Sequence, residues 1–169
     1  GPNQDYPMNQ THITEFFDLI ADGGLEQNDI MAMSAEVLKA EKDADAYLAN
    51  DKESAYQAHF AIPLWEWVMI EQLEDGLIFR GKQADALYAQ IEDAFGEGEL
   101  DLAAAALKDL SNADALALIQ KELAPAYTLV NFSKPLNDEL QIVLIRSNKL
   151  ERFLALCNTL ELSAAPSCL

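Results

Sequence analysis

The residues that could carry chemistry are two histidines, two cysteines and many carboxylates. Neither His12 nor His59 lies in an HExxH motif, and no glutamate has a histidine three residues later, as a di-iron bundle requires. Cys157 and Cys168 lack the CxxC spacing of a zinc site. We therefore expect no metal centre and no bound cofactor.

Nucleophilic and phosphate-binding motifs are also missing from the sequence. No serine lies in GxSxG, no GxxxxGK[ST] loop occurs, and "DAFGEGELD" lacks the alternating ligands of an EF-hand. Carboxylates do recur at helical spacing, but a chain with 29 acids contains such pairs by chance. We predict that the protein is not an enzyme, with an acid site that uses a divalent metal as the alternative. The pairs are Asp18/Asp22, Glu41/Asp45 and Glu71/Asp75.

Charge is the strongest signal in the composition. The net charge is −18, and the excess of acids lies entirely within residues 1–125, because residues 126–169 carry four acids and four bases. Such a charge repels nucleic acids and anionic membranes, whereas it attracts a basic protein and speeds its encounter. We expect a basic protein partner, no direct nucleic-acid contact and no membrane contact. The alternative is that the acidity only maintains solubility.

The stretch "HFAIPLWEWVMIEQLEDG", residues 59–76, is too short and too charged to cross a bilayer. Placed on a helix at about 100° per residue, its two tryptophans face nearly opposite ways, and Trp67 shares a side with Glu71, Glu74 and Asp75. Tryptophan is enriched in interface hot spots, and acids around it suit a basic counterpart. We predict these four residues as partner-binding residues; packing of both tryptophans in a core is the alternative.

The period of the apolar residues is helical almost throughout, which predicts an all-α fold. We expect a single-domain bundle of about six or seven helices over residues 10–162, or alternatively a short helical-repeat array. Residues 1–9 begin with Gly1-Pro2 and are interpreted as a tag remnant with a disordered N-terminus, and 163–169 as a C-terminal tail. The expected helices cover 11–22, 29–50, 82–95, 100–110, 112–132 and 135–160, with a further helix broken at Pro63.

The last expected helix, which starts at Pro135, has residues at alternating spacings of four and three that are all apolar except Ser147. That pattern predicts a core-facing helix, or a coiled-coil homodimer through residues 136–157. Its members are Leu136, Leu140, Val143, Ser147, Leu150, Leu154 and Cys157.

In size, charge and expected helix content, the chain resembles the small acidic helical proteins that neutralise basic bacterial toxins, namely immunity proteins and antitoxins. The resemblance implies a cytoplasmic inhibitor that blocks the active site of its partner. Two isolated cysteines also fit a reducing compartment such as the cytoplasm. The alternatives are a helical-repeat adaptor that binds a peptide in an apolar groove and a DNA mimic whose carboxylates imitate phosphates on a nucleic-acid-binding protein.

Overall fold

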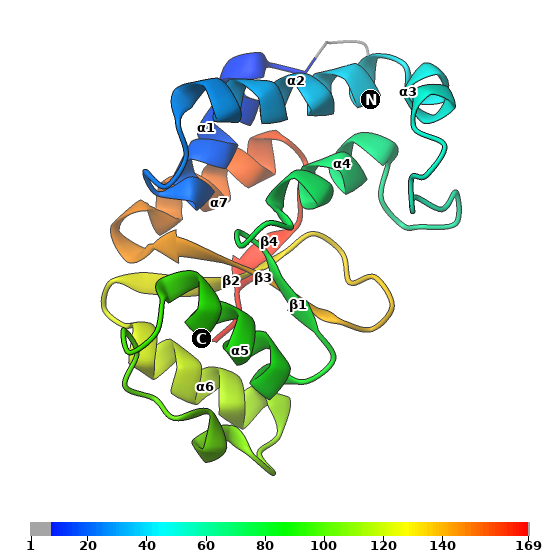
Figure 1. The fold of residues 1–169 in the computed structure, drawn as a ribbon. Coiled ribbons are helices and arrows are strands. Elements are labelled where there is room, and N and C mark those ends of the chain that lie inside the picture. Colours follow the sequence, from blue (N-terminus) through cyan, green and yellow to red (C-terminus); the bar gives the residue numbers. More distant parts are fainter. Residues whose placement is uncertain (1–7, 169) are drawn as a thin grey trace. The chain divides into compact units, whose positions relative to one another are not determined.

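The structure, a computed structural model, describes residues 8–168, which form two compact units, one up to residue 72 and one from residue 73 onward. Residues 1–9 are predicted to be a tag remnant and disordered, and residues 1–7 of that range lie outside the described part of the chain. The boundary between the units falls at the end of one helix, α4, and the single domain over 10–162 stays a prediction. Figure 1 shows the elements of each unit.

The first unit consists of helices. They are α1 (Gln10–Ala21), α2 (Gln27–Lys42), α3 (Ala44–Asn50) and α4 (Leu64–Leu73), whose last residue belongs to the second unit. The side chain of Asn9 accepts a hydrogen bond from the backbone N–H of Thr11 and so begins α1, and left-handed backbone at Asp22 ends it. Apolar residues at the helical period form the buried faces of α1 and α2, namely Ile13, Phe16, Phe17, Ile20, Ile30, Met33, Val37 and Ala40.

The second unit is built around an antiparallel sheet of four strands. The strands are β1 (Phe79–Gly81), β2 (Tyr127–Phe132), β3 (Leu140–Arg146) and β4 (Ala164–Pro166), in the order β1-β3-β2-β4. The register pairs Arg80 with Gln141, Val130 with Val143, and Val130 with Pro166. Helices α5 (Ala84–Phe95) and α6 (Asn112–Leu123) lie on one side of the sheet, and α7 (Leu150–Thr159) lies on the other (Figure 1). Short 3₁₀ turns occupy η2 (Ala104–Leu107) and η3 (Ser147–Lys149).

One hydrophobic core of the second unit lies between the sheet and α5 and α6. Leu129 of β2 and Ile142 of β3 belong to this core, and their neighbours Val130 and Val143 are also fully buried. Because successive side chains of a strand point to opposite faces, both faces of the two central strands are covered. The residues of the core are Phe79, Ala84, Leu87, Tyr88, Ile91, Leu107, Ala115, Leu116, Ile119, Leu123, Leu129 and Ile142.

The predicted all-α fold is wrong, since the protein combines helices with a sheet, and neither a helical bundle nor a helical-repeat array describes it. The helix predicted over 112–132 ends at Leu123, and the segment after Pro125 becomes β2. The residues of the predicted seam over 136–157 lie in a turn, in β3, in η3 and in α7. This segment therefore offers no continuous helical seam for a coiled-coil dimer.

The physical reason for the error is the burial of β3 on both faces. A strand that is covered on both sides reads as a continuous apolar run, so the run "LQIVLIR" lacks the alternation that marks a half-exposed strand. The segment predicted as a tail, 163–169, contains β4, and Cys168 packs against the core. Of the kink or fresh helix start expected at Pro63, the structure shows the start, because α4 begins at Leu64. The residues before it, 51–63, form no helix, so no helix is broken there.

Candidate functional site

Two of the four residues selected from the sequence, Trp67 and Glu71, lie on α4 within the first unit. Trp67 is only 6% exposed, and its ring centroid lies 5.3 Å from that of Phe60, whereas Trp65 is half-exposed. Glu71 is half-buried, and its charge contributes to a raised pKa at Tyr47. Burial leaves Trp67 little surface to offer a partner, and its part in binding stays a prediction.

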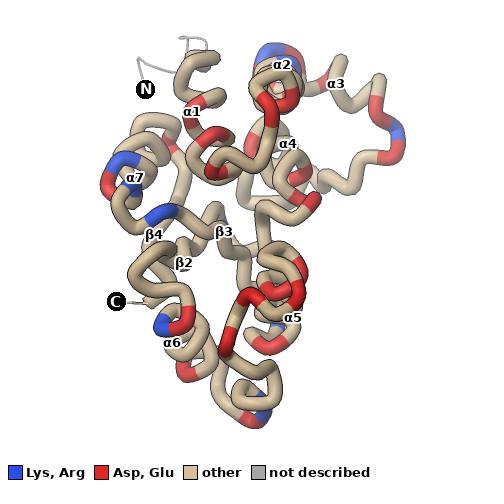
Figure 2. Tube along the Cα trace, turned by 60° about the vertical axis from the view of Figure 1, so that its left-hand side comes forward, with Lys and Arg blue, Asp and Glu red and all other residues tan. Residues whose placement is uncertain are grey.

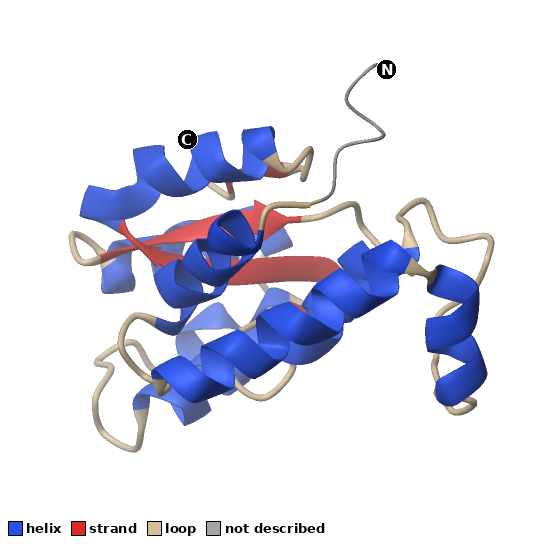
Figure 3. Ribbon diagram, turned by 90° about the horizontal axis from the view of Figure 1, so that it is seen from above, coloured by secondary structure: helices blue, strands red, loops and turns tan. Residues whose placement is uncertain are grey.

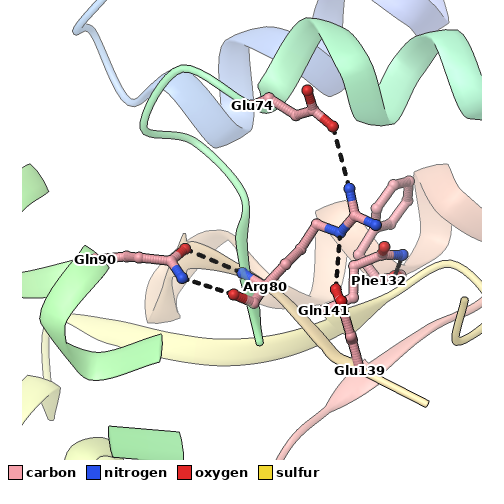
Figure 4. Close-up of polar contacts among 6 residues, drawn as sticks. All are labelled: Glu74, Arg80, Gln90, Phe132, Glu139 and Gln141. Carbon is pink, nitrogen blue, oxygen red and sulfur yellow. Dashed lines mark hydrogen bonds and ion pairs between the residues drawn. The ribbon is translucent and has the colours of Figure 1, made fainter. Parts of the chain in front are cut away.

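The other two, Glu74 and Asp75, belong to the second unit and are exposed. Glu74 Oε1 accepts a hydrogen bond from Arg80 Nη1 at 3.1 Å, and Glu139 Oε2 lies 3.6 Å from Arg80 Nε (Figure 4). Arg80 therefore neutralises part of the charge at Glu74. The side chain of Arg80 is only 21% exposed and that of Glu139 only 29%, so water screens these ion pairs only in part.

The backbone of Arg80 is also held from outside the sheet. The side-chain amide of Gln90, on α5, accepts a hydrogen bond from Arg80 N at 3.1 Å and donates one to Arg80 O at 2.6 Å (Figure 4). The amide thus occupies the outer edge of β1 as another strand would. An edge covered in this way cannot pair with a foreign strand.

Two more amide side chains on α6 bind backbone in the same manner. Gln120 donates to Tyr127 O and accepts from Leu129 N, both at 2.9 Å, on the part of β2 that lies beyond β4. Asn112 accepts from Ala84 N and donates to Lys82 O, both at 2.9 Å. These bonds fasten α6 to the sheet and to the start of α5, and so they hold the end of the unit on which acids accumulate.

Acidic side chains gather around Tyr88 at this end. Tyr88 is fully buried, and its hydroxyl donates a hydrogen bond of 2.6 Å to Leu102 O. Burial, followed by the charges of Glu92, Glu122 and Asp101, raises the pKa of Tyr88 to about 12. Burial is the largest cause of this shift, and the three carboxylates add to it because nearby negative charge disfavours the phenolate.

A hollow of about 310 Å³ lies beside this cluster, where α5 ends. Its walls include Glu92, Asp93 and Glu97, with Gly96 and Gly98 shaping the loop between them. Both glycines have a positive φ, 102° and 78°, which side chains rarely tolerate. The loop can therefore turn back sharply and present acids on both sides of the hollow.

These carboxylates are not neutralised within the part of the chain that the structure describes. Residues 83–123 contain nine acids and two lysines, and the ion pairs that Lys39 and Arg80 form within 8–168 involve Glu36, Glu74 and Glu139 instead. Figure 2 shows acidic positions along α5 and the loop that follows it. We call the carboxylates of Glu92, Asp93, Glu97, Glu99, Asp101 and Glu122 the acidic end of the second unit.

The described residues can also be compared with the requirements of a metal site and of a membrane-spanning helix. Residues 8–168 contain no group of three or more His, Cys, Asp or Glu side chains that could hold a metal ion. No helix in that range has the length and apolar character needed to cross a membrane. Cys157 is buried, and burial raises the pKa of the Cys168 thiol, which lowers its reactivity.

Comparison with protein-family models, with curated proteins and with solved structures finds no match to this chain. The acidic end was missed by sequence reasoning because its members are spread over 92–122 and the charge excess extends over the whole of 1–125. One signal could have found it. The glycines in "FGEGELD" break a helix between acids, and so mark a turn that exposes carboxylates.

Proposed function

We propose that the protein binds and neutralises a basic protein partner, and that the acidic end of the second unit makes the contact. The observation that supports the proposal best is the group of carboxylates near Tyr88, namely Glu92, Asp101 and Glu122, which form no ion pair within the described residues. Charges of one sign on one surface speed association with an oppositely charged protein. Inhibition would follow by covering the active site or substrate groove of the partner, as immunity proteins and antitoxins do.

The residues predicted from the sequence form a second part of the proposal. Glu71, Glu74 and Asp75 would contact basic residues of the partner, and Trp67 would support α4 from inside the first unit. The cytoplasmic location also remains part of the proposal. If the partner is basic, its association rate with this protein should fall as the ionic strength rises, because exposed charges are screened beyond about 10 Å at 0.1 M ionic strength.

The first experiment captures partners from a nuclease-treated lysate of the source organism, at low and at high salt, followed by identification by mass. The purified partner is then mixed rapidly with three forms of the protein. One is the wild type, and the second carries Glu92→Gln, Asp93→Asn and Glu97→Gln. The third is a matched control with the same change in net charge on exposed acids of the first unit, Asp18→Asn, Glu26→Gln and Glu53→Gln.

We expect the association rate constant to fall steeply with ionic strength, and to fall about tenfold or more in the Glu92 triple variant but only about twofold in the control. Equal effects of the two triple variants would refute the acidic end as the contact surface. An association rate that does not depend on salt would refute electrostatic binding, and a partner held equally at both salts would favour the peptide-binding adaptor. A captured nucleic-acid-binding protein displaced by DNA would favour the DNA mimic.

A further inference from the structure

Helices α2 and α3 meet at an elbow in the first unit. Asp43 alone joins them: its backbone, at φ −153° and ψ 92°, ends α2, and its side chain accepts a hydrogen bond of 3.0 Å from Ala46 N, which begins α3. Figures 1 and 3 show the short helix α3 turned away from the direction of α2. A cleft of about 450 Å³ lies against these two helices, a size typical of small-ligand sites.

The walls of this cleft combine one aromatic ring with carboxylates. Tyr47, on α3, is half-buried, and Glu36, Asp43 and Asp51 line the same space together with Asn50. Burial first, and then the charges of Glu36, Glu71 and Asp51, raise the pKa of the Tyr47 hydroxyl. The ring therefore lies where water is partly excluded and where negative charge converges.

Two lysines also line the cleft, and their positive charge disfavours the binding of a cation there. Lys39 is paired with Glu36 at 3.0 Å, and its side chain is 70% exposed, so water screens most of its charge. Lys42 lies in the last turn of α2, where the free carbonyl groups of the helix favour a positive charge. The cleft is lined by three carboxylates and two ammonium groups, and the charges that raise the pKa of Tyr47 are those of carboxylates.

We propose that the cleft between α2 and α3 binds a guanidinium group, such as the arginine side chain of a peptide or protein. A guanidinium is planar, stacks on aromatic rings and forms paired hydrogen bonds with carboxylates, which a rounder and more strongly hydrated ammonium group does less well. Tyr47 would provide the ring and Asp51 the main carboxylate, with Glu36 as a second acceptor. The cleft belongs to the first unit and does not depend on the acidic end of the second.

The test is an NMR titration of the full chain with N-acetyl-arginine-N-methylamide. The ring signals of Tyr47, assigned by comparison with Tyr47→Phe, report binding. The citrulline analogue, which has nearly the same shape but no charge, and the lysine analogue are the matched ligands. Asp51→Asn and Glu36→Gln remove carboxylates of the cleft, and Asp29→Asn makes the same charge change on an exposed residue of α2 that does not line it.

We expect a saturable shift with a dissociation constant of roughly 1–10 mM, the range of a single weak contact. Binding should weaken about fivefold or more in Asp51→Asn or Glu36→Gln, strengthen in Lys42→Ala, and stay unchanged in Asp29→Asn. The absence of a saturable shift would overturn the proposal. So would equal binding of citrulline or lysine analogues, or equal effects of Asp51→Asn, Glu36→Gln and Asp29→Asn.

Discussion

Replacement of Gln120 by glutamate tests the idea that amide side chains fasten α6 to the sheet. The carboxylate would still accept the hydrogen bond from Leu129 N, but it would lose the donor to Tyr127 O and place an oxygen about where the amide nitrogen lies, 2.9 Å away. The side chain is half-buried, so solvent compensates only in part. The lost hydrogen bond and the repulsion between the introduced oxygen and Tyr127 O together cost about 1–3 kcal/mol. We expect the free energy of unfolding to fall by about 2–3 kcal/mol at pH 7.

The effect should reverse in acid, which separates it from a general loss of packing. Burial and the facing carbonyl favour the protonated glutamate and raise its pKa in the folded state. A group with a raised pKa stabilises the fold fully below its unfolded pKa, about 4.3 for glutamate, and loses that contribution as the pH rises through the folded pKa. The difference from wild type should therefore shrink near pH 4, where the protonated carboxyl can again donate to Tyr127 O.

Urea unfolding followed by far-UV circular dichroism at pH 7 and pH 4 measures this change, and hydrogen exchange at Leu129 N–H reports the bond that the introduced carboxylate would keep. Gln83→Glu is the matched control, because Gln83 is exposed and its side chain makes no capping bond at the start of α5. An acid there should change stability by about 0.5 kcal/mol or less. Equal stability of the two variants, or a loss at Gln120 that persists at pH 4, would refute the role given to the amide.

Three further predictions concern local features. Tyr88→Phe should remove the step near pH 12 from the titration of absorbance at 295 nm, and an unchanged titration would contradict the assignment of that step to Tyr88. Because the raised pKa favours the neutral phenol, the free energy of unfolding of the wild type should fall between about pH 10 and 12. Ser111→Ala should lower the free energy of unfolding by about 1 kcal/mol in urea titrations, since the serine caps α6 through Asp114 N at 3.1 Å, and an unaffected midpoint would exclude the cap. Trp67→Phe retains the half-exposed Trp65, and Trp65→Phe retains the buried Trp67. Acrylamide should therefore quench the fluorescence of Trp67→Phe more strongly. The opposite order would show that Trp67 is the more exposed ring.

The tryptophan stretch shows why the candidate contact could not be fixed from the sequence. Val68, Met69, Ile70 and Leu73 are fully buried, and so is most of Trp67. A helix that is apolar nearly all round has no single apolar face in its sequence. The position of a ring relative to nearby acids therefore does not show which side of the helix is buried against the rest of the protein. The neighbours in space decided it, among them Phe60, which packs against Trp67.

The sequence by itself determined the local features of the helices and the electrostatic character of the chain. Ile13, Phe16 and Ile20 recur at the helical period and are buried, and Pro63 comes directly before a helix start, because periodicity and the missing N–H of proline act within a few residues. The net charge of −18 depends on composition alone. These properties require no knowledge of distant contacts.

Only the tertiary structure decided that residues 127–132 and 140–146 are strands. Their apolar residues satisfy a helical period as well as a strand buried on both faces, and pairing between β2 and β3, together with the cover of α5, α6 and α7, selected the strand. The acidic end also depends on contacts distant in sequence, since the Glu122 carboxylate accepts a hydrogen bond from Asp101 N across 21 residues. Strand pairing and the convergence of charges are long-range properties, and the linear pattern of a chain does not contain the distances that determine them.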